Sequence, residues 1–362
     1  MINVTKPFLP PRKEYDLYLD GIWERNWLTN NGPLVNDLEL KLKDYLDLKH
    51  LLFVSNGTIA LQIAIKAMEL SGEIITTPFS YVATTSSIVW ENCTPIFVDI
   101  DKNSFNIDAS KIENSITEKT SAILATHVFG NPCNIDAIEA IAQKHELKII
   151  YDAAHCFGSK YKGKSVMEYG DISTLSFHAT KLYHTTEGGA VVSPKPELIE
   201  KMAFLRNFGH DGPDKFKSIG INGKNSEFHA AMGLANLKYA DDIIKKRMDD
   251  HAIYNKWLNP LKLQTQFISK DVDFNHAYYP VVFNTEDDCK LILKELANRE
   301  IYARRYFYPV LSSLNYVKKQ STPIADDISK RILCLPLYYQ LNETEINMIC
   351  RVILRYLNKE QG

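Results

Sequence analysis

The sequence of 362 residues lacks the paired cysteines, long apolar runs and charge imbalance that mark several classes of protein. Its six cysteines are scattered without a Cys-x-x-Cys pair, which argues against a zinc site and is typical of reduced thiols in a cytoplasmic protein. No apolar run approaches a membrane span, and the N-terminus lacks the pattern of a signal peptide. A formal net charge of −2 predicts no attraction for nucleic acid or anionic lipid. We expect a cytoplasmic protein without metal, nucleic-acid or membrane partners.

What the chain does contain is an alternation of short apolar segments and amphipathic helical ones. We expect strands at STLSFHA and GAVVS and at 51–54, 73–78, 95–100, 121–130 and 147–154. We expect helices between them at 58–70, 80–92 and 134–146. Alternating strands and helices, with strands apolar along nearly their whole length, predict an α/β protein whose mostly parallel sheet is covered on both faces.

Changes in sequence pattern divide the chain into three parts. The proline-rich residues 1–15 predict an extended arm. A long helical pattern covers 226–257, and the segments that follow it predict a strand and two helices, at 277–283, 287–300 and 342–359. Because the chain is longer than one hydrophobic core usually supports, we expect a large domain over 16–257 and a smaller C-terminal α+β domain over 258–362.

The segment SNGT begins the predicted helix at 58–70 directly after a strand. A helix N-terminus presents unpaired N–H groups and the positive end of the helix dipole, which suits a phosphate. Gly57 allows close approach of the backbone, and Thr58 adds a hydroxyl. An ordinary N-cap by Ser55 or Asn56 also explains these residues, and it is the favoured interpretation of this segment taken alone. Neither GxGxxG nor GxxxxGKS occurs, so dinucleotide-binding and P-loop sites lose support.

Asp152 ends an apolar strand within YDAAH, at the edge of the sheet where open α/β proteins bind ligands. Its carboxylate could bind a metal, a ribose or a protonated ring nitrogen. Lys181 lies further along in the apolar segment LSFHATKLY, where burial would lower its pKa and leave an amine able to attack a carbonyl. The alternative is a lysine with a packed stem and a solvated head. The flanking His178 and His184 are expected as pocket residues rather than metal ligands.

Several motifs, in order along nearly the whole chain, together resemble the DegT/StrS-type nucleotide-sugar aminotransferases. The motifs are SNGTIAL, PFSYVATTSSI, YDAAHCFGSKYKGKSVMEYGDISTLSF, HATK with EGGAVV, LRNFGHDG, INGKNSEFHAAMGLANL, ARRYFYP and LCLPLYYQLNETEI. The resemblance implies the PLP-dependent transferase fold, fold type I, with pyridoxal 5'-phosphate (PLP) as cofactor. It also implies a homodimer with active sites shared between the subunits.

The resemblance assigns roles to individual residues. Lys181 would bind PLP covalently and, once freed, transfer the proton during catalysis. Asp152 would keep the pyridine nitrogen protonated, so that the ring acts as an electron sink. His155, where the family more often has glutamine, would contact the ring near its phenolic oxygen, and Tyr81 would stack on the ring. The phosphate would be held by Gly57, Thr58, Ile59 and Ser176, and by Asn222 and Lys224 from the partner subunit.

The pattern HATK followed by EGGA resembles the branch that aminates 4-keto-6-deoxy sugars, whereas many members have Tyr-Pro-Thr-Lys before the lysine. Related dehydratases have histidine in place of the lysine, so the retention of Lys181 favours transamination. We therefore expect transfer of an amino group from L-glutamate to a nucleotide-linked 4-keto-6-deoxyhexose. The particular reaction indicated converts dTDP-4-keto-6-deoxy-D-glucose to dTDP-4-amino-4,6-dideoxy-D-glucose, for O-antigen or other surface glycans.

Other functions remain open on the sequence. Amination at C3 and use of a GDP- or UDP-linked sugar would need the same cofactor. A nicotinamide-dependent sugar reductase is also an α/β protein, and a non-catalytic PLP-binding regulator is a further alternative. Four residues could contact the diphosphate or could equally be packed or solvated: Arg304, Arg305, Tyr306 and Tyr308.

Overall fold

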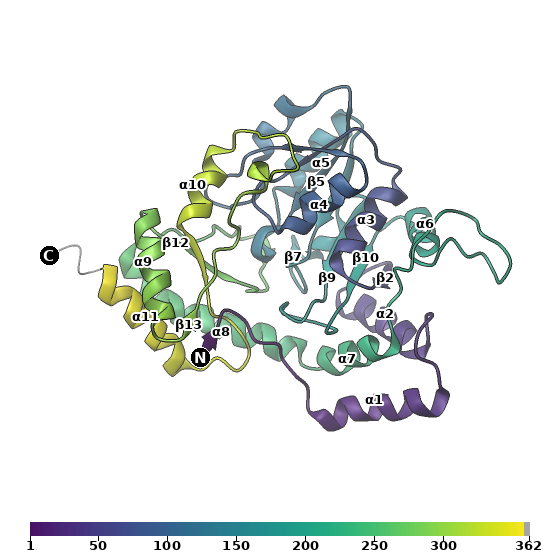
Figure 1. Cartoon of the computed structure of the whole chain (residues 1–362), viewed down its shortest axis with the longest axis horizontal. Helices are drawn as coiled ribbons and strands as arrows, with labels where there is room; N and C mark the ends of the chain where they lie inside the picture. The colour runs from purple at the N-terminus through teal and green to yellow at the C-terminus, as the bar shows by residue number, and fades with distance from the viewer. Residues whose placement is uncertain (358–362) are drawn as a thin grey trace.

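The computed structural model describes residues 1–357 (Figure 1). The strands are β1 (Ile2–Asn3), β2 (Leu51–Val54), β3 (Glu73–Thr76), β4 (Thr94–Phe97), β5 (Thr120–Thr126), β6 (Lys148–Asp152), β7 (Lys160–Tyr161), β8 (Lys164–Ser165), β9 (Ile172–Ser176), β10 (Gly189–Val192), β11 (Val272–Asp273), β12 (Tyr279–Val282), β13 (Ile301–Tyr302) and β14 (Ile332–Leu335). The helices are α1 (Arg12–Arg25), α2 (Pro33–Tyr45), α3 (Gly57–Ala67), α4 (Val82–Trp90), α5 (Ile135–Lys144), α6 (Pro196–Arg206), α7 (Glu227–Leu237), α8 (Ala240–Leu258), α9 (Glu286–Ala297), α10 (Pro323–Arg331) and α11 (Glu343–Leu357). Single 3-10 turns are η1 (Ala109–Lys111), η2 (Glu113–Ser115), η3 (Val128–Gly130), η4 (Val166–Glu168), η5 (Asn259–Leu261) and η6 (Leu311–Ser313).

The largest sheet has seven strands in the order β2-β10-β9-β6-β5-β3-β4. Its neighbouring strands are parallel except for β10, which runs antiparallel to both β2 and β9. Smaller sheets join β1 to β13, β12 to β14, and β7 to both β8 and β11. The prediction of an α/β fold with a mostly parallel central sheet and a smaller C-terminal part is confirmed.

Both faces of the central sheet are buried, which explains why its strands are apolar along their whole length. In β2, Leu52 and Val54 belong to the core beneath α3, α4 and α6. Leu51 and Phe53 point to the other face, into the core formed with α2 and α7. Successive side chains of a strand point to opposite faces, so every position of such a strand has a core to enter. Each large apolar side chain buried in this way contributes roughly 1.5–3 kcal/mol.

The N-terminal arm is shorter than the sequence predicted. Helix α1 begins at Arg12, so the extended segment ends at Pro11, and residues 12–15 are helical rather than part of the arm. Strand β1 pairs with β13, and the carbonyl of Val4 accepts a hydrogen bond from the N–H of Leu337. Further along, the carbonyl of Phe8 accepts one from His184. The arm therefore contacts both the C-terminal part and the loop that follows Lys181.

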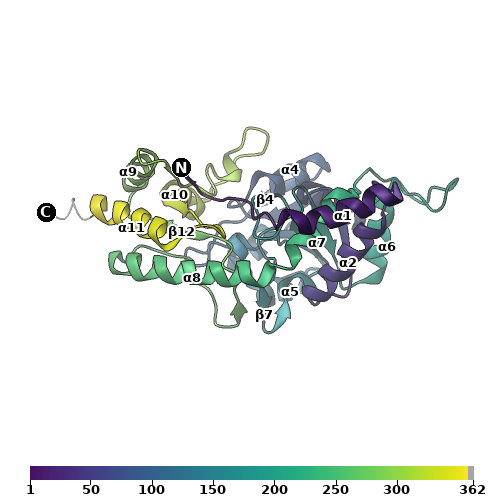
Figure 2. The same ribbon diagram turned by 90° about the horizontal axis from the view of Figure 1, so that it is seen from below.

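The long helical pattern at 226–257 forms two helices, α7 and α8, interrupted at Lys238 and Tyr239. Helix α8 continues from the central sheet towards the C-terminal part, where it packs against α11 (Figure 2). Its first turn adds Ala240 to the core of the large part, and its last turns add Tyr254 and Leu258 to the C-terminal core. The predicted boundary near residue 258 thus falls at the end of a helix that serves both cores.

Other boundaries differ from expectation by a few residues. The strand expected over 121–130 ends at Thr126 and is followed by η3, and the strand expected over STLSFHA ends at Ser176. The terminal helix predicted for 342–359 is α11, and positions 358 and 359 lie outside the described residues. Helices α1, α2, α6 and α10 had no counterpart in the expected elements.

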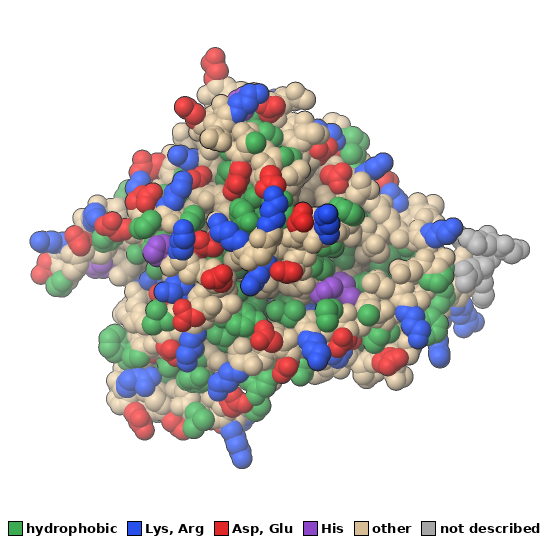
Figure 3. Space-filling model, turned by 180° about the vertical axis from the view of Figure 1, so that it is seen from behind, with side chains coloured by type: hydrophobic (Ala, Val, Ile, Leu, Met, Phe, Trp, Pro, Cys, Tyr) green, Lys and Arg blue, Asp and Glu red, His purple; other side chains and the backbone are tan. Residues whose placement is uncertain are grey.

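The surface carries charges of both signs. Lys and Arg side chains are interspersed with Asp and Glu over the face shown in Figure 3. Within residues 1–357, no helix has both the length and the apolar character needed to cross a bilayer.

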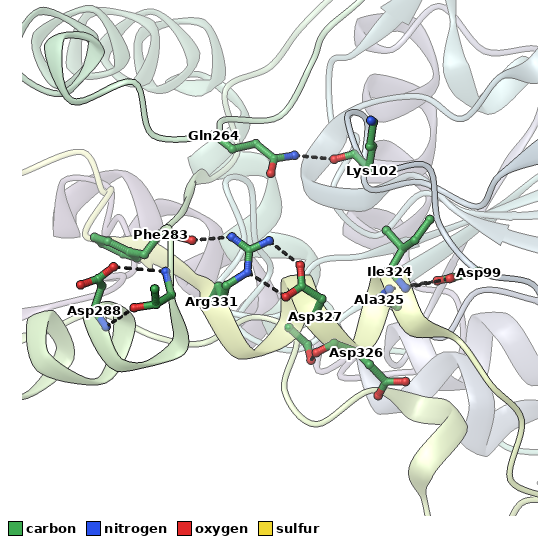
Figure 4. Close-up of polar contacts among 12 residues, drawn as sticks. Asp99, Lys102, Gln264, Phe283, Asp288, Ile324, Ala325, Asp326, Asp327 and Arg331 are labelled. Carbon is green, nitrogen blue, oxygen red and sulfur yellow. Dashed lines mark hydrogen bonds and ion pairs between the residues drawn. The ribbon is translucent and has the colours of Figure 1, made fainter.

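A carboxylate connects the C-terminal part to the central sheet. Asp99, after β4, accepts hydrogen bonds from the N–H groups of Ile324 and Ala325 in α10, both at 2.9 Å (Figure 4). Asp99 is buried, and it thereby caps the N-terminus of α10 from a distant segment of the chain. Close by, the side chain of Gln264 donates to the carbonyl of Lys102 (Figure 4).

Replacing Asp99 with alanine should lower the free energy of unfolding by about 1–2 kcal/mol, because two N–H groups at a helix end lose their buried acceptor. Asp327→Ala is the matched control, since Asp327 is exposed and its ion pair with Arg331 spans one turn of the same helix. Such a pair is worth about 0.3–0.5 kcal/mol. Urea unfolding of both variants measures the difference, and equal losses would contradict a capping role for Asp99.

Candidate active site

A pocket of about 630 Å³ lies where the carboxyl ends of β6 and β9 meet the start of α3. This volume is within the usual range for small-molecule sites. The C-terminal part closes one side with Tyr278, Arg304, Tyr306 and Phe307. The pocket therefore lies between the central sheet and the C-terminal part, at the sheet edge expected from the strand order.

The structure brings together most of the residues predicted for the site. The lining includes Gly57, Thr58, Ile59, Tyr81, Asp152, His155, Ser176 and Lys181. Asn222 and Lys224 do not line it. Asn222 is exposed, and the ammonium of Lys224 lies 4.9 Å from the centre of the Phe208 ring.

Asp152 is buried at the end of β6. Its Oδ2 accepts a hydrogen bond from Thr84 Oγ1 at 2.7 Å, and its Oδ1 accepts one from the N–H of Ala154 at 3.2 Å. Burial raises the pKa of the Asp152 carboxyl, while the hydrogen bond from Thr84 acts to lower it. A carboxylate so placed can pair with a cationic group that enters the pocket.

Lys181 follows a tight turn after β9, in which its N–H donates to the carbonyl of His178 at 2.8 Å. Its Nζ lies in the pocket, 3.5 Å from the hydroxyl of Tyr278. Burial lowers the pKa of the Lys181 amine, and the carboxylate of Asp152 opposes that shift. A lowered pKa increases the neutral fraction of the amine, the form that attacks a carbonyl. The alternative of a solvated lysine head does not match this position.

His155 is held as a neutral hydrogen-bond donor. Its Nδ1 accepts the N–H of Phe129 at 3.2 Å, which places the ring proton on Nε2. The ring is buried beside Tyr278 and Phe307, with centroid distances of 4.9 and 5.9 Å. Burial lowers the pKa of His155 well below its ordinary value, so the ring stays uncharged. The Nε2–H can donate to an acceptor in the pocket.

The start of α3 combines the two roles that the sequence left open. Asn56 is the N-cap, and its side chain accepts the N–H of Ile59 at 2.9 Å. That bond occupies the N–H of Ile59, so the backbone donors left in the first turn are those of Gly57 and Thr58. A Cβ on Gly57 would lie 2.9 Å from Cβ of Ser176, so the glycine is needed for this close approach. The turn is a cradle for an anion.

The sequence did not single out several residues that shape the pocket. Ser80 lines it, and Thr84 positions Asp152, although both lie in a motif that was recognised as a whole. Tyr278 and Phe307 come from the C-terminal part, and no signal near them in the sequence marks them as neighbours of Lys181. Only the folded chain brings these segments together.

Two open expectations can be resolved residue by residue. Arg304 and Tyr306 line the pocket, whereas the guanidinium of Arg305 packs 3.7 Å from the centre of the Tyr308 ring. His178 lines the pocket and pairs with Glu187 at 3.5 Å.

His184 lies outside the pocket, contrary to expectation. It is buried, and its ring nitrogens bond the carbonyl of Phe8 and the N–H of Thr186. No cluster of three or more His, Cys, Asp or Glu side chains in the described part of the chain is arranged to hold a metal ion.

Comparisons with known proteins agree with this geometry. The model of the DegT/DnrJ/EryC1/StrS aminotransferase family matches residues 12–354. The chain is 42% identical over 361 residues to a dTDP-4-amino-4,6-dideoxy-D-glucose transaminase of Shigella dysenteriae, covering 97% of this chain and 98% of that protein. It is 35% identical to a GDP-perosamine synthase of Escherichia coli O157:H7, covering 97% of each chain. The solved structure of DesI in the presence of its TDP-sugar product matches with a TM-score of 0.93 at 30% identity, covering 99% of this chain and 95% of that one.

The fold is that of a PLP-dependent aminotransferase. The requirements of that cofactor match three features of the pocket: a partly buried lysine amine, a buried carboxylate and an anion cradle at a helix start. Within this class, the chain belongs to the DegT/DnrJ/EryC1/StrS aminotransferase family. The resemblance drawn from the sequence motifs is confirmed.

Gly57→Ala should weaken PLP binding about tenfold, because the new methyl group would force Ser176 and the start of α3 apart, and overpacking of this kind typically costs about 1–3 kcal/mol. Gly21→Ala in α1 is the control, since its Cβ would meet only the end of the flexible Arg25 side chain. Titration of cofactor-free protein with PLP gives both dissociation constants. Equal affinity in the two variants would show that Gly57 is not part of the cradle.

Proposed function

We propose that this protein transfers an amino group from L-glutamate to dTDP-4-keto-6-deoxy-D-glucose, forming dTDP-4-amino-4,6-dideoxy-D-glucose. The observation that carries transamination is the placement of the Lys181 amine and the buried Asp152 carboxylate on the walls of one pocket. The choice of sugar is supported by the 42% identity, over nearly the whole chain, to a transaminase named for that product.

The roles of the pocket residues follow from their chemistry. PLP, when bound, supplies an electron sink for the bond-breaking step. Asp152 would pair with the pyridine nitrogen, and His155 would donate its Nε2–H to the phenolic oxygen. Tyr81, whose ring is 59% exposed in this subunit, would stack on the cofactor. Gly57, Thr58 and Ser176 would hold the phosphate.

Lys181 has two duties in this proposal. Its Nζ would hold the cofactor covalently and, when free, would move a proton at the sugar carbon that receives the amino group. The lowered pKa suits a base, and a positioned proton-transfer group typically contributes about 10²–10⁴-fold in rate. The nearby hydroxyl of Tyr278 offers the free amine a hydrogen-bond partner while it is not bound to the cofactor.

Arg304 is the residue we assign to the anionic ends of the substrates. It lines the pocket from the C-terminal part, with its guanidinium 5.4 Å from the centre of the Tyr306 ring. A guanidinium binds phosphate and carboxylate oxygens in the same geometry. The diphosphate of the nucleotide sugar and a carboxylate of glutamate could therefore use Arg304 in turn.

We also propose a homodimer in which the partner subunit completes the site with Asn222 and Lys224. In one chain these residues lie outside the pocket, beside a loop with strongly exposed apolar side chains. Phe216 and Ile219 of this loop are 66% and 78% exposed, which is costly for a chain in isolation and suits a surface covered by a second copy.

We also propose that the chain divides into a large domain and a smaller C-terminal domain near residue 258.

A cytoplasmic location and a role in O-antigen or other surface-glycan synthesis complete the proposal. Its six cysteines are all free and buried, which fits a reducing compartment. The glycan role rests on the proposed sugar product alone.

A GDP-linked sugar is the second candidate substrate, because the chain is 35% identical to a GDP-perosamine synthase over nearly its whole length. A UDP-linked sugar and amination at C3 stay open on the same basis of family membership. Nothing in the pocket favours a nicotinamide-dependent reductase or a non-catalytic regulator.

Purified protein with PLP should show a visible absorption band that changes when glutamate is added, and Lys181→Ala should show no such exchange. With dTDP-4-keto-6-deoxy-D-glucose present, wild-type protein should release 2-oxoglutarate continuously. Parallel reactions with GDP- and UDP-linked keto sugars measure the preference for the nucleotide. A glutamate-dependent change without turnover of any keto sugar would retain the cofactor chemistry but refute the proposed substrate class.

Light scattering should give a mass of about twice the 41.3 kDa of one chain, because the exposed Phe216 and Ile219 suit a surface covered by a second copy. Lys224→Ala should keep this mass and bind PLP more weakly. A wild-type mass equal to that of one chain would overturn the shared site. A Lys224→Ala variant that binds PLP as tightly as wild type would do the same.

A further inference from the structure

Three buried hydroxyl groups connect Asp152 with the end of strand β5. Thr84 Oγ1 lies 2.7 Å from Asp152 Oδ2, Ser80 Oγ lies 2.8 Å from Thr84 Oγ1, and Thr126 Oγ1 lies 3.0 Å from Ser80 Oγ. All three side chains are buried, with exposed fractions of 2% or less. We refer to Thr126, Ser80 and Thr84 as the hydroxyl relay.

The direction of every hydrogen bond in the relay follows from the charge on Asp152. A carboxylate only accepts, so Thr84 must donate its single hydroxyl proton to Asp152. Ser80 must then donate to Thr84, and Thr126 must donate to Ser80. The relay is thus a chain of aligned dipoles that points at one oxygen of the carboxylate, and such aligned bonds strengthen each other in a buried site.

The relay joins three segments of the chain beside Asp152. Thr126 ends β5 directly opposite Asp152 in β6, Ser80 lies in the loop after β3, and Thr84 lies in the first turn of α4. Tyr81 lies between Ser80 and Thr84, and its carbonyl accepts the N–H of Thr84 at 3.2 Å. The same hydroxyls therefore fix the turn that presents Tyr81 to the pocket.

We propose that the hydroxyl relay is a positioning device that keeps Asp152 ionised and thereby holds the proton on the pyridine nitrogen of PLP. This inference rests on the proposed role of Asp152 as the partner of that nitrogen. Without donors, a buried carboxylate would take the proton itself, and the ring would lose its ability to draw electrons. Hydrogen bonds to the charged form of a carboxyl act against that transfer.

The other groups that face Asp152 do not replace the relay. Lys181 lies across the pocket and stabilises the carboxylate only while its amine is charged. The thiols of Cys133 and Cys156 lie on the inner side, and burial raises the pKa of both, so they stay neutral. The remaining donor is the backbone N–H of Ala154, which no side-chain substitution removes. The relay therefore supplies the side-chain hydrogen bond to Asp152 that a substitution can remove.

The test uses the full-length protein loaded with PLP that carries ¹⁵N in its ring, because the nitrogen chemical shift reports the ring proton directly. Wild type should give the signal of a protonated nitrogen. Thr84→Val should shift the equilibrium of this proton towards Asp152 about tenfold or more, since a hydrogen bond to a charged group is lost. Ser80→Ala and Thr126→Val should give smaller shifts, in that order, because their dipoles act from further away.

Thr84→Ser and Thr85→Val serve as controls. Serine keeps the donor and should restore the wild-type signal, and failure to do so would mean that Thr84 acts through its methyl group, which overturns the inference. Thr85 is the next residue of α4, equally buried, with a hydroxyl that has no partner among the described residues, so its loss should leave the signal unchanged. Thermal melting of each variant separates a loss of folding from a loss of the ring proton.

Asp152→Asn separates this inference from the proposed site. If Asp152→Asn leaves the protonated signal in place, Asp152 is not the partner of the ring nitrogen, and that part of the proposed function fails. If Asp152→Asn removes the signal while Thr84→Val behaves like Thr85→Val, the relay alone is overturned. An effect confined to Thr84, with none from Ser80 or Thr126, also overturns the relay as a unit.

Discussion

The burial of one carboxylate, that of Asp152, is the constraint on which the rest of the pocket depends. An ionised carboxyl in the interior is strongly disfavoured unless donors and a counter-charge surround it. Thr84 and Ala154 supply the donors from inside the protein, which leaves the outward side of the group free for a cation. Burial in the pocket wall lowers the pKa of the Lys181 amine, whereas the charge of Asp152 raises it. The two groups proposed for transamination therefore influence each other's protonation.

Much of this arrangement could be predicted from the sequence, because its signals are local. An apolar strand that ends in an acid placed Asp152 at the carboxyl edge of the sheet, and an apolar setting marked Lys181 as unusual among lysines. The segment SNGT predicted the start of α3. In the structure the N–H of Ile59 bonds the Asn56 cap, and the N–H groups of Gly57 and Thr58 are left for an anion. The parallel sheet followed from strands that are apolar on both faces.

The features that escaped prediction depend on contacts between distant segments. Helix α1 fully buries only Ile22, with Tyr15, Tyr18 and Leu19 half-buried on the same face. The break between α7 and α8 occurs without a glycine or proline. In the sequence Ser80 has no feature that marks it as special, and only the fold brings it into contact with Thr126 of β5 and Thr84 of α4. His184 seemed to belong to the pocket because of its nearness in sequence to Lys181, yet the backbone turn directs it towards the N-terminal arm.

Helix α8 has a consequence for any attempt to exchange parts between relatives. Because one helix supplies Ala240 to one core and Tyr254 and Leu258 to the other, the chain has no point near residue 258 where it can be cut without removing side chains from a packed interior. A chimaera that takes its C-terminal part from another enzyme, in order to acquire that enzyme's sugar preference, would have to take the second half of α8 together with α11, which packs against it. The segment to exchange is therefore the C-terminal part together with the second half of α8, rather than a domain that begins at residue 258.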